Sequence, residues 1–283
     1  MMNRILILTN FNAGRKKAIK YKKTVLEFVL KHTKQFKFID VDELKTIDVS
    51  EYDTILVMGG DGTVNKVLPY LINSDKVLGI IPTGTANLLA AKLGFTNNLK
   101  KTLEIIDKQE TKKIDLLNIN GENCVLRCGF GYDSDIICKT PQSLKNKFGY
   151  FAYFIAGILF ALRLKRKEYV VNDNKIEASC LIFANCANMY RNIISLANDS
   201  KPDDGLIEVF ILKTTNPIIF FIELLLIAFN IRKNSSRAEY MQAKEIHIEN
   251  LLTNCHIDGE KKKLKDDINM KIREKCVNVF YKK

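Results

Sequence analysis

Short apolar runs alternate with longer amphipathic stretches over the first 110 residues. Four runs predict buried strands: Ile5–Thr9, Phe36–Val41, Thr54–Met58 and Val77–Ile81. The stretches after them predict helices, at residues 15–32, 63–72, 86–93 and 99–108. Strands that alternate with helices are typical of a parallel sheet with helices on both faces. In such sheets the ligand is held by loops at the carboxyl ends of the strands.

The pattern changes near residue 113, where shorter runs dominate. They predict strands of an antiparallel sheet or sandwich: Ile114–Ile119, Asn123–Gly129, Ala178–Ala184, Gly205–Leu212, Glu245–Ile248 and Val277–Tyr281. Two strongly hydrophobic helices interrupt them, near residues 144–164 and 217–231. We therefore predict an α/β fold in which a parallel-sheet domain, residues 1–116, precedes a mainly antiparallel β-sandwich domain, residues 117–283, with two inserted hydrophobic helices.

The composition is that of a globular chain with a core of its own, since 47% of its 283 residues are hydrophobic and 27% are charged. Its 44 Lys and Arg against 32 Asp and Glu give a net charge of +12. That surplus favours an anionic partner, such as nucleotide phosphates or an acidic membrane, unless it is only solvated surface charge. The basic residues are scattered and no recognition motif occurs, so nucleic acid is not expected as a partner.

Cysteine usage and hydropathy bear on the compartment. The seven cysteines form no CxxC pair and no zinc pattern with the three histidines, which indicates free thiols in a reducing compartment. The first apolar run is too short for a signal sequence, and no stretch reaches the roughly 20 apolar residues of a membrane helix. We therefore expect a cytoplasmic protein.

The sharpest chemical signal is GGDGT, at Gly59–Thr63, directly after the third buried strand. Its glycines allow a tight turn and the close approach of a ligand to the backbone. The N–H groups at the start of the following helix favour a phosphate, whereas the alternative is a tight turn with an Asp helix cap. Asp61 would repel a bare phosphate, so it indicates either magnesium or hydrogen bonds that order a neighbouring loop.

Two further turns follow the same rule. NFNAG, at Asn10–Gly14, ends the first strand, and PTGTAN, at Pro82–Asn87, ends the fourth. Three glycine-bearing strand ends of one sheet converge on one crevice, which favours a phosphate site. No GxxxxGK[ST] occurs, so the chain is not a P-loop ATPase. GFGYD, at Gly129–Asp133, lacks the third glycine of a dinucleotide fingerprint and no helical pattern follows it, so we predict a strand-end turn there.

Six segments in this order carry a family resemblance along nearly the whole chain: NFNAG, GGDGTVNKV, PTGTANLLA, GFGYDSD, DDGLIEV at Asp203–Val209 and HIDGE at His256–Glu260. Together they resemble the diacylglycerol kinase catalytic family, which also includes sphingosine kinases and bacterial lipid kinases. The resemblance implies an ATP-binding domain over residues 1–116, a lipid-substrate domain over residues 117–283, and a site in the cleft between them.

The resemblance also implies roles for single residues. ATP would be bound by Asn10, Asn12, Gly14, Gly59, Gly60, Asp61, Gly62, Thr63, Asn65, Thr83, Gly84 and Thr85. Asp258 would act as the base on the lipid hydroxyl, and Glu260 would help to bind the nucleotide–metal group. A structural magnesium ion would be held by Asp204 and by the backbone carbonyls of Lys201 and Leu206.

Three departures from the family pattern stand out. NFNAG lacks the usual proline, Lys66 replaces a glutamate, and Leu88 replaces an aspartate of many diacylglycerol kinases. Lys66 could strengthen phosphate binding or reflect a changed magnesium arrangement, and Leu88 leaves the lipid substrate open. Without the resemblance, DGEKKK would favour a polar Asp-Gly hairpin turn over catalysis by Asp258; with it, catalysis is favoured.

The two hydrophobic helices have basic ends, such as the cluster Arg163, Lys165, Arg166 and Lys167. An apolar helix beside cations suits peripheral attachment to an anionic membrane, although two buried core helices are an equal alternative. The expected activity is ATP- and Mg²⁺-dependent phosphorylation of a lipid alcohol, giving a product such as phosphatidic acid. The alternatives are a kinase of a soluble acceptor, similar to NAD kinase or phosphofructokinase, and a non-catalytic nucleotide- or lipid-binding regulator. A homodimer is among the assemblies left open.

Overall fold

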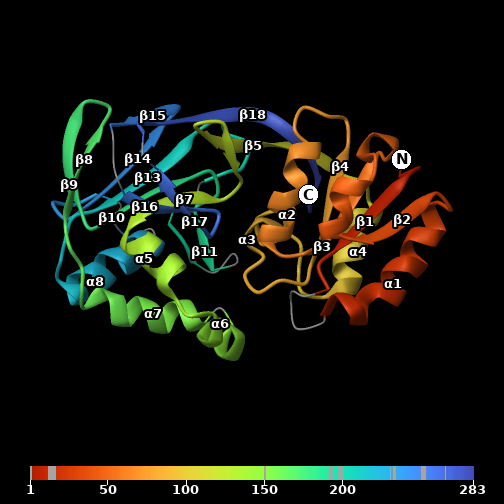
Figure 1. The fold of residues 1–283 in the computed structure, drawn as a ribbon, viewed down its shortest axis with the longest axis horizontal. Helices are drawn as coiled ribbons and strands as arrows, with labels where there is room; N and C mark the ends of the chain where they lie inside the picture. The colour runs from red at the N-terminus through yellow and green to blue at the C-terminus, as the bar shows by residue number, and fades with distance from the viewer. Residues whose placement is uncertain are drawn as a thin grey trace. The chain divides into compact units, whose positions relative to one another are not determined.

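The computed structural model describes residues 2–11, 17–149, 151–190, 194–196, 200–229, 231, 234–249, 253–264 and 266–283 (Figure 1). The chain divides into two compact units, residues 1–114 together with 275–283, and residues 115–274. The sequence pattern predicted that residues 275–283 are part of the second domain. They belong instead with the first unit, because the last strand pairs there with a strand formed by residues 77–82.

A parallel sheet forms the centre of the first unit, in the order β2-β1-β3-β4-β18. Its strands are β1 (Ile5–Thr9), β2 (Phe36–Asp40), β3 (Thr54–Gly59), β4 (Val77–Pro82) and the end of β18 (Ile268–Phe280). Every residue of β1 and β3 is buried, which is why both read as continuous apolar runs. The predicted parallel sheet is confirmed.

The helices of the first unit follow the strands as the pattern indicated. They are α1 (Lys17–His32), α2 (Asp61–Val67), α3 (Leu88–Lys92) and α4 (Leu99–Asp107), with 3₁₀ turns η2 (Val41–Thr46), η3 (Val49–Glu51) and η4 (Leu68–Tyr70). The expected helix over residues 63–72 is shorter and starts earlier. Its last part becomes η4, which contains Pro69, a residue without the N–H that an α-helix needs.

Two sheets make up the second unit. One is antiparallel, in the order β14-β13-β10-β7-β16-β17. The other is part of a ten-stranded sheet in which β18 is followed by β15, β8 and β9, and β5 pairs with both β18 and β6. The strands are β5 (Thr111–Ile119), β6 (Glu122–Cys124), β7 (Arg127–Gly131), β8 (Lys167–Val171), β9 (Asn174–Ala178), β10 (Cys180–Ala184), β13 (Ile207–Leu212), β14 (Ala238–Ala243), β15 (Glu245–Ile248), β16 (Thr253–Ile257) and β17 (Glu260–Leu264). One buried cluster contains Phe130 and Phe183 from the first sheet with Ile246 and Met270 from the second, which is the core of a sandwich.

A helix after the GFGYD turn contradicts the sequence reading. Residues Tyr132–Lys139 form α5 immediately after Gly131, so the prediction of a plain strand-end turn was wrong. The apolar period was hidden because α5 buries two polar residues, Asp133 and Ser134. Gly131 has φ +64°, and a Cβ there would lie 2.4 Å from the Ser179 carbonyl oxygen, so only glycine fits this junction.

The hydrophobic segments form α6 (Gln142–Phe148), α7 (Phe151–Ala161) and α8 (Pro217–Ala228), and a small strand pair, β11 (Asn188–Tyr190) with β12 (Ile194–Ser195), completes the second unit. The first segment is therefore two helices and not one. Asn216 caps α8 by accepting the N–H groups of Ile218 and Ile219. Within the described part of the chain, no helix has the length and apolar character needed to cross a membrane.

Candidate functional site

Two glycine loops of the first unit touch through their backbones. Because Gly59 of β3 pairs with Pro82 of β4, the loops leave the sheet side by side. The N–H groups of Thr83 and Gly84 both donate to the Gly59 carbonyl, at 3.0 and 3.3 Å. A Cβ on Gly84 would lie 2.5 Å from the Gly60 Cα, closer than any real contact. The glycines are therefore needed where one loop packs on the other.

Asp61 connects the same two loops. Its carboxylate oxygens accept the N–H groups of Leu88 and Leu89 at 3.0 and 3.1 Å. These are the first two residues of α3, whose N–H groups have no partners within the helix. Of the two roles that the sequence left open for Asp61, the observed contacts are those of a residue that orders the neighbouring loop.

Buried polar atoms without a hydrogen-bond partner lie at these strand ends. Within the described residues they include Thr9 Oγ1, Thr83 Oγ1 and Asn87 Oδ1. Each such atom costs about 1–3 kcal/mol unless a ligand or water satisfies it. Asn87 Oδ1 would lie 2.7 Å from a Cβ on Gly84, so it faces the loop contact. Hydroxyl and amide groups together fit a ligand with both donors and acceptors, as a nucleotide has.

The other residues predicted to bind ATP have fewer contacts with the two interlocked glycine loops. The Asn10 N–H donates to the Met58 carbonyl at 3.4 Å, which puts Asn10 beside the end of β3. Gly62 and Asn65 lie on α2, while Thr85 is exposed between β4 and α3. Thr63 is buried and its side chain covers Gly59. The predicted residues Asn12 and Gly14 lie outside the described residues.

Lys66, which departs from the family pattern, lies on the surface of α2. Its Nζ forms an ion pair with Asp42 Oδ1 of η2 at 2.7 Å, with half of the lysine side chain exposed. Such exposed pairs contribute little to stability. The contact gives Lys66 a local partner within the first unit.

The Asp258–Gly259 turn of the second unit connects β16 to β17. Both residues have positive φ, +49° and +90°, as a two-residue hairpin turn requires. Asp258 Oδ2 accepts the Val125 N–H at 2.7 Å, and Oδ1 accepts those of Leu126 and Arg127 at 2.8 and 3.1 Å. The carboxylate is thus held by consecutive backbone donors.

Cys124 and Glu260 lie beside this turn, the first buried and the second exposed. The Cys124 thiol also donates to Asp258 Oδ1, at 3.2 Å. Burial raises the pKa of that thiol, and the Asp258 charge raises it further, so the thiol keeps its proton. Glu260, predicted to act beside Asp258, begins β17 and is exposed. The structure describes all seven cysteines as free thiols.

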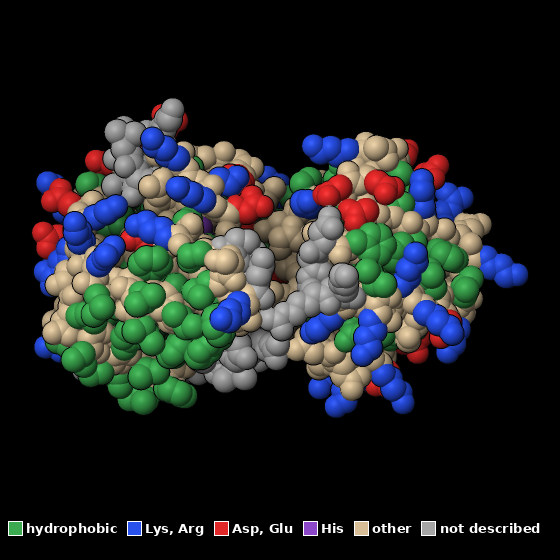
Figure 2. Space-filling view, turned by 60° about the horizontal axis from the view of Figure 1, so that its bottom comes forward, with side chains coloured by type: hydrophobic (Ala, Val, Ile, Leu, Met, Phe, Trp, Pro, Cys, Tyr) green, Lys and Arg blue, Asp and Glu red, His purple; other side chains and the backbone are tan. Residues whose placement is uncertain are grey.

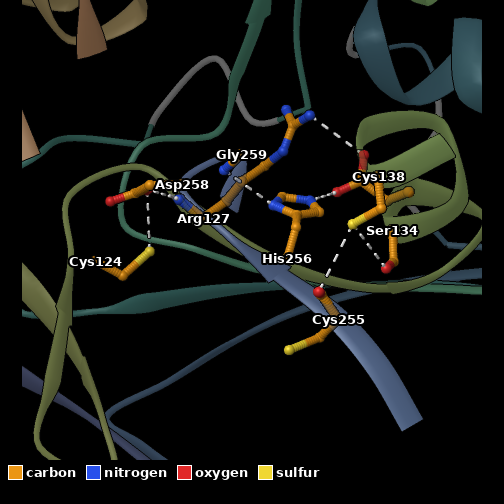
Figure 3. Close-up of polar contacts among 9 residues, drawn as sticks. Cys124, Arg127, Ser134, Cys138, Cys255, His256, Asp258 and Gly259 are labelled. Carbon is orange, nitrogen blue, oxygen red and sulfur yellow. Dashed lines mark hydrogen bonds and ion pairs between the residues drawn. The ribbon is translucent and has the colours of Figure 1, made fainter. Parts of the chain in front are cut away.

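Next to the turn lies a buried network that the sequence did not reveal (Figure 3). His256 Nε2 lies 2.7 Å from Asp133 Oδ2, and Asp133 Oδ1 lies 3.2 Å from Arg127 Nη2. The Gly259 N–H donates to His256 Nδ1 at 3.3 Å. Burial alone would raise the pKa of Asp133, but the Arg127 charge and the hydrogen bonds from His256 and Arg127 outweigh it and lower the pKa to about 2. Asp133 is visible in the sequence as part of the GFGYDSD segment, but no motif spacing relates it to His256.

The predicted magnesium turn is held by its own side chains. Asp204 Oδ2 accepts the Lys201 N–H and Oδ1 accepts the Leu206 N–H, both at 3.1 Å. The Gly205 N–H donates at 2.8 Å to Asp115, a fully buried carboxylate that the sequence reading missed. In the described part of the chain no group of three or more His, Cys, Asp or Glu side chains could hold a metal ion. The predicted ligand set differs from such a group, because it consists of one carboxylate and two backbone carbonyls. Each Asp204 oxygen accepts one N–H group and keeps a lone pair that could bind a hard cation.

Residues 4–119 match the family model of the diacylglycerol kinase catalytic domain. The chain carries a diacylglycerol kinase catalytic domain. A diacylglycerol kinase from Staphylococcus epidermidis is 28% identical over 219 residues, 75% of this chain and 69% of that protein. An uncharacterized protein from Synechocystis is 33% identical over 159 residues, so the match spans 55% of this chain and only 37% of that relative.

The fold has solved counterparts as well. The crystal structure of a proposed diacylglycerol kinase from Bacillus anthracis has a TM-score of 0.82 at 22% identity, covering 99% of this chain and 96% of that one. At that identity the likeness shows the fold, and it confirms the predicted arrangement of α/β and antiparallel parts. The predicted family is confirmed, and the same matches support the predicted enzyme class, a lipid kinase.

The second unit of this kinase has an exposed apolar face, formed by α7 and α8 (Figure 2). The residues of α7 that are buried are small, namely Ala152, Ala156, Gly157 and Ala161. Phe160 of α7 packs against the core. Other large apolar residues on both helices and their ends are exposed, namely Phe151, Phe154, Ile158, Leu159, Leu162, Ile218, Ile222, Leu225, Phe229 and Ile231. Phe220 and Ile227 of α8 pack into the protein core. The helices therefore bury one face and expose the other, so neither is a fully buried core helix.

Gly84→Ala should destabilise the kinase domain, because the added Cβ meets the Gly60 backbone. Overpacking of this kind costs about 1–3 kcal/mol. Gly62→Ala is the matched control, since a Cβ there has no heavy atom within 4 Å and replaces a helical glycine; it should stabilise by up to about 1 kcal/mol. Urea unfolding followed by circular dichroism measures both. Equal stability of Gly84→Ala and wild type would contradict the loop contact.

Asp133 should contribute to acid unfolding. Its pKa is about 2 in the folded chain against an ordinary 3.8, so its stabilisation is complete above pH 3.8 and is lost as the pH falls through about 2. At about 1.4 kcal/mol per pKa unit, the loss is of the order of 2 kcal/mol. The free energy of unfolding, measured from pH 5 to pH 2, should fall less steeply for Asp133→Asn than for wild type. Parallel pH curves for the two proteins would contradict an ionised Asp133.

Proposed function

We propose that this protein transfers the γ-phosphoryl group of ATP to the hydroxyl of a lipid alcohol, with diacylglycerol as the favoured class and phosphatidic acid as its product. One observation carries the proposal: the residues that match the catalytic domain, 4–119, include both interlocked glycine loops. The lipid acceptor is supported by the relatives named diacylglycerol kinase.

The first unit is proposed to bind the nucleotide. Backbone N–H groups of the loops at Gly59–Thr63 and Pro82–Asn87 suit phosphate oxygens, and Thr83 and Asn87 offer buried polar atoms in need of a partner. Asp61 keeps the second loop against the first through Leu88 and Leu89. Such a preformed site lowers the ordering cost of binding.

The second unit is proposed to supply the base. Asp258 takes the proton of the lipid hydroxyl as the hydroxyl oxygen attacks the γ-phosphorus, and ADP leaves. Its carboxylate already accepts three backbone N–H groups, which fix its orientation before substrate binds. Glu260, two residues later and exposed, is proposed to help bind the nucleotide–metal group.

Magnesium is proposed at two places. With ATP it would neutralise phosphate charge, which is its usual part in phosphoryl transfer. At the Asp204 turn, the carboxylate with the carbonyls of Lys201 and Leu206 would hold a structural ion, a donor set of the hard oxygen type that magnesium prefers. The bound ion would then stabilise the same turn that Asp115 holds through its hydrogen bond from the Gly205 N–H.

The α7–α8 face is proposed to dock on an anionic membrane, where a cytoplasmic enzyme would meet its lipid. Large apolar side chains cover the face, and Arg163, Lys165, Arg166 and Lys167 follow α7 and are all exposed. Apolar insertion and attraction to anionic lipid reinforce each other at such a surface. Arg166 also contacts Glu177 and the Lys213 carbonyl, so part of its charge is locally engaged.

A radiolabelled-ATP assay over a panel of lipid alcohols tests the function, with NAD and sugar phosphates as soluble acceptors. We expect label only in lipid, and we expect Asp258→Asn to lower the rate by about 10²–10⁴-fold, the usual contribution of a base. Calorimetric titration with a non-hydrolysable ATP analogue should give nearly equal affinities for this variant and wild type. Sedimentation in the same buffer decides between monomer and homodimer.

Other outcomes point to the alternatives. Label in NAD or a sugar phosphate would replace the lipid acceptor with a soluble one. ATP binding without label in any acceptor would indicate a non-catalytic regulator. Activity of Asp258→Asn close to wild type would remove the base from this residue.

Vesicle binding should depend on both parts of the docking face. Leu159→Ser removes a side chain that is 58% exposed on α7, and Leu30→Ser removes one that is 54% exposed on α1 of the first unit. We expect only Leu159→Ser to weaken co-sedimentation with phosphatidylserine-rich vesicles, because only that leucine would leave water on docking.

The charge part is tested with Arg163→Ala/Lys165→Ala. Each cation contributes about 1 kcal/mol near an anionic surface, so the loss should be about 2 kcal/mol, roughly 30-fold. High salt should produce a similar loss for wild type, and neutral vesicles should bind both proteins alike. Equal binding of all variants to anionic vesicles would show that this face does not dock.

A further inference from the structure

Three ionisable side chains are buried together beneath the Asp258 turn without an assigned role. Arg127, Asp133 and His256 are 9%, 3% and 1% exposed. Burial of such groups is costly unless they pair and hydrogen-bond with one another. They do so in a row, from the guanidinium through the carboxylate to the imidazole.

The carboxylate sets the proton position on the imidazole. Each Asp133 oxygen has its own partner, Arg127 at Oδ1 and His256 at Oδ2. An ionised carboxylate only accepts, so Nε2 of His256 carries the proton that faces it. Nδ1 of the neutral ring is then an acceptor, and it faces the Gly259 N–H. The network therefore ends in a hydrogen bond to the backbone of the turn.

That turn needs support from both sides. Asp258 has φ +49°, a conformation that costs a residue with a side chain more than glycine. The N–H groups of residues 125–127 hold the Asp258 carboxylate, and His256 holds the N–H of the next residue, Gly259. Arg127 takes part in both, through its backbone N–H and through its guanidinium (Figure 3).

We propose that His256, oriented by Asp133 and Arg127, is a positioning residue for phosphoryl transfer: it fixes the Asp258–Gly259 turn so that the Asp258 carboxylate is held where it acts. The proposal rests on the proposed function of Asp258. The three side chains have no contact with the reacting atoms in this role. Their effect on rate comes through geometry, and a displacement of about 1 Å at a catalytic group can cost roughly 100-fold.

Two substitutions of His256 separate its two hydrogen bonds. In His256→Gln the amide nitrogen can reach the place of Nε2 and donate to Asp133, but nothing accepts from Gly259. In His256→Asn the amide oxygen can take the place of Nδ1 and accept from Gly259, but nothing reaches Asp133. His247→Gln is the control, a histidine of the same unit whose Nδ1 lies 2.9 Å from Asn269 Oδ1 and which lies outside all six family segments.

The expected result is a fall in kcat of roughly 10- to 100-fold for His256→Gln, with the KM for ATP within about two-fold of wild type. His256→Asn should recover much of the loss, and His247→Gln should retain the wild-type kcat. Amide hydrogen exchange followed by NMR should show faster exchange of the Gly259 N–H in His256→Gln and near wild-type exchange in His256→Asn.

Wild-type kcat in His256→Gln would overturn the proposal, and so would a lower kcat with unchanged exchange at Gly259. If His256→Gln does not fold, Arg127→Lys replaces it, since lysine keeps the charge but not the guanidinium geometry; unchanged kcat and unchanged Gly259 exchange in that variant would overturn the proposal equally. If wild type phosphorylates no lipid, the proposed function fails, and the exchange data alone still decide whether His256 holds the turn.

Discussion

Carboxylate oxygens that accept backbone N–H groups hold each described loop of the candidate site. Asp61 accepts from Leu88 and Leu89, and Asp258 accepts from residues 125–127. Asp204 closes its own turn. A charged acceptor makes these bonds stronger than bonds between neutral groups, and each satisfies donors that the loop could not otherwise pair. The loops can therefore be glycine-rich and still keep one conformation.

This dependence also explains why an acidic residue can belong in a site for an anion. The Asp61 carboxylate accepts the N–H groups that begin α3, so its charge stabilises the loop more than it repels a phosphate. His256 and Arg127 do the corresponding work for Asp133, whose charge would be too costly to bury alone. In both cases one negative charge organises groups that come from separate parts of the chain.

How much the sequence predicts depends on how local the determining contacts are. β1, β3 and β4 were found within one residue, because each is a continuous buried run. α5 was missed because its buried face carries Asp133 and Ser134, which pair with residues distant in sequence or pack where an apolar residue was expected. The Asp258 turn was found through its DGE letters, but its partners at 125–127 lie about 130 residues away and have no local pattern. Side-chain chemistry that depends on such distant pairing cannot be deduced from spacing.

The last strand has a consequence for the order in which the molecule is made. β18 pairs with β4 through Asn278 and Val279, so the strand beside β4 comes from residues near position 280, whereas β1, β2, β3 and β4 all lie within the first 82 residues. On the ribosome, β4 emerges well before β18, and the edge of β4 that pairs with β18 stays open until β18 has been made. An open edge of buried apolar strand invites pairing with another chain. The nascent first unit therefore has a strand edge open to unwanted pairing until β18 is made, and loss of residues 275–283 would leave that edge open permanently.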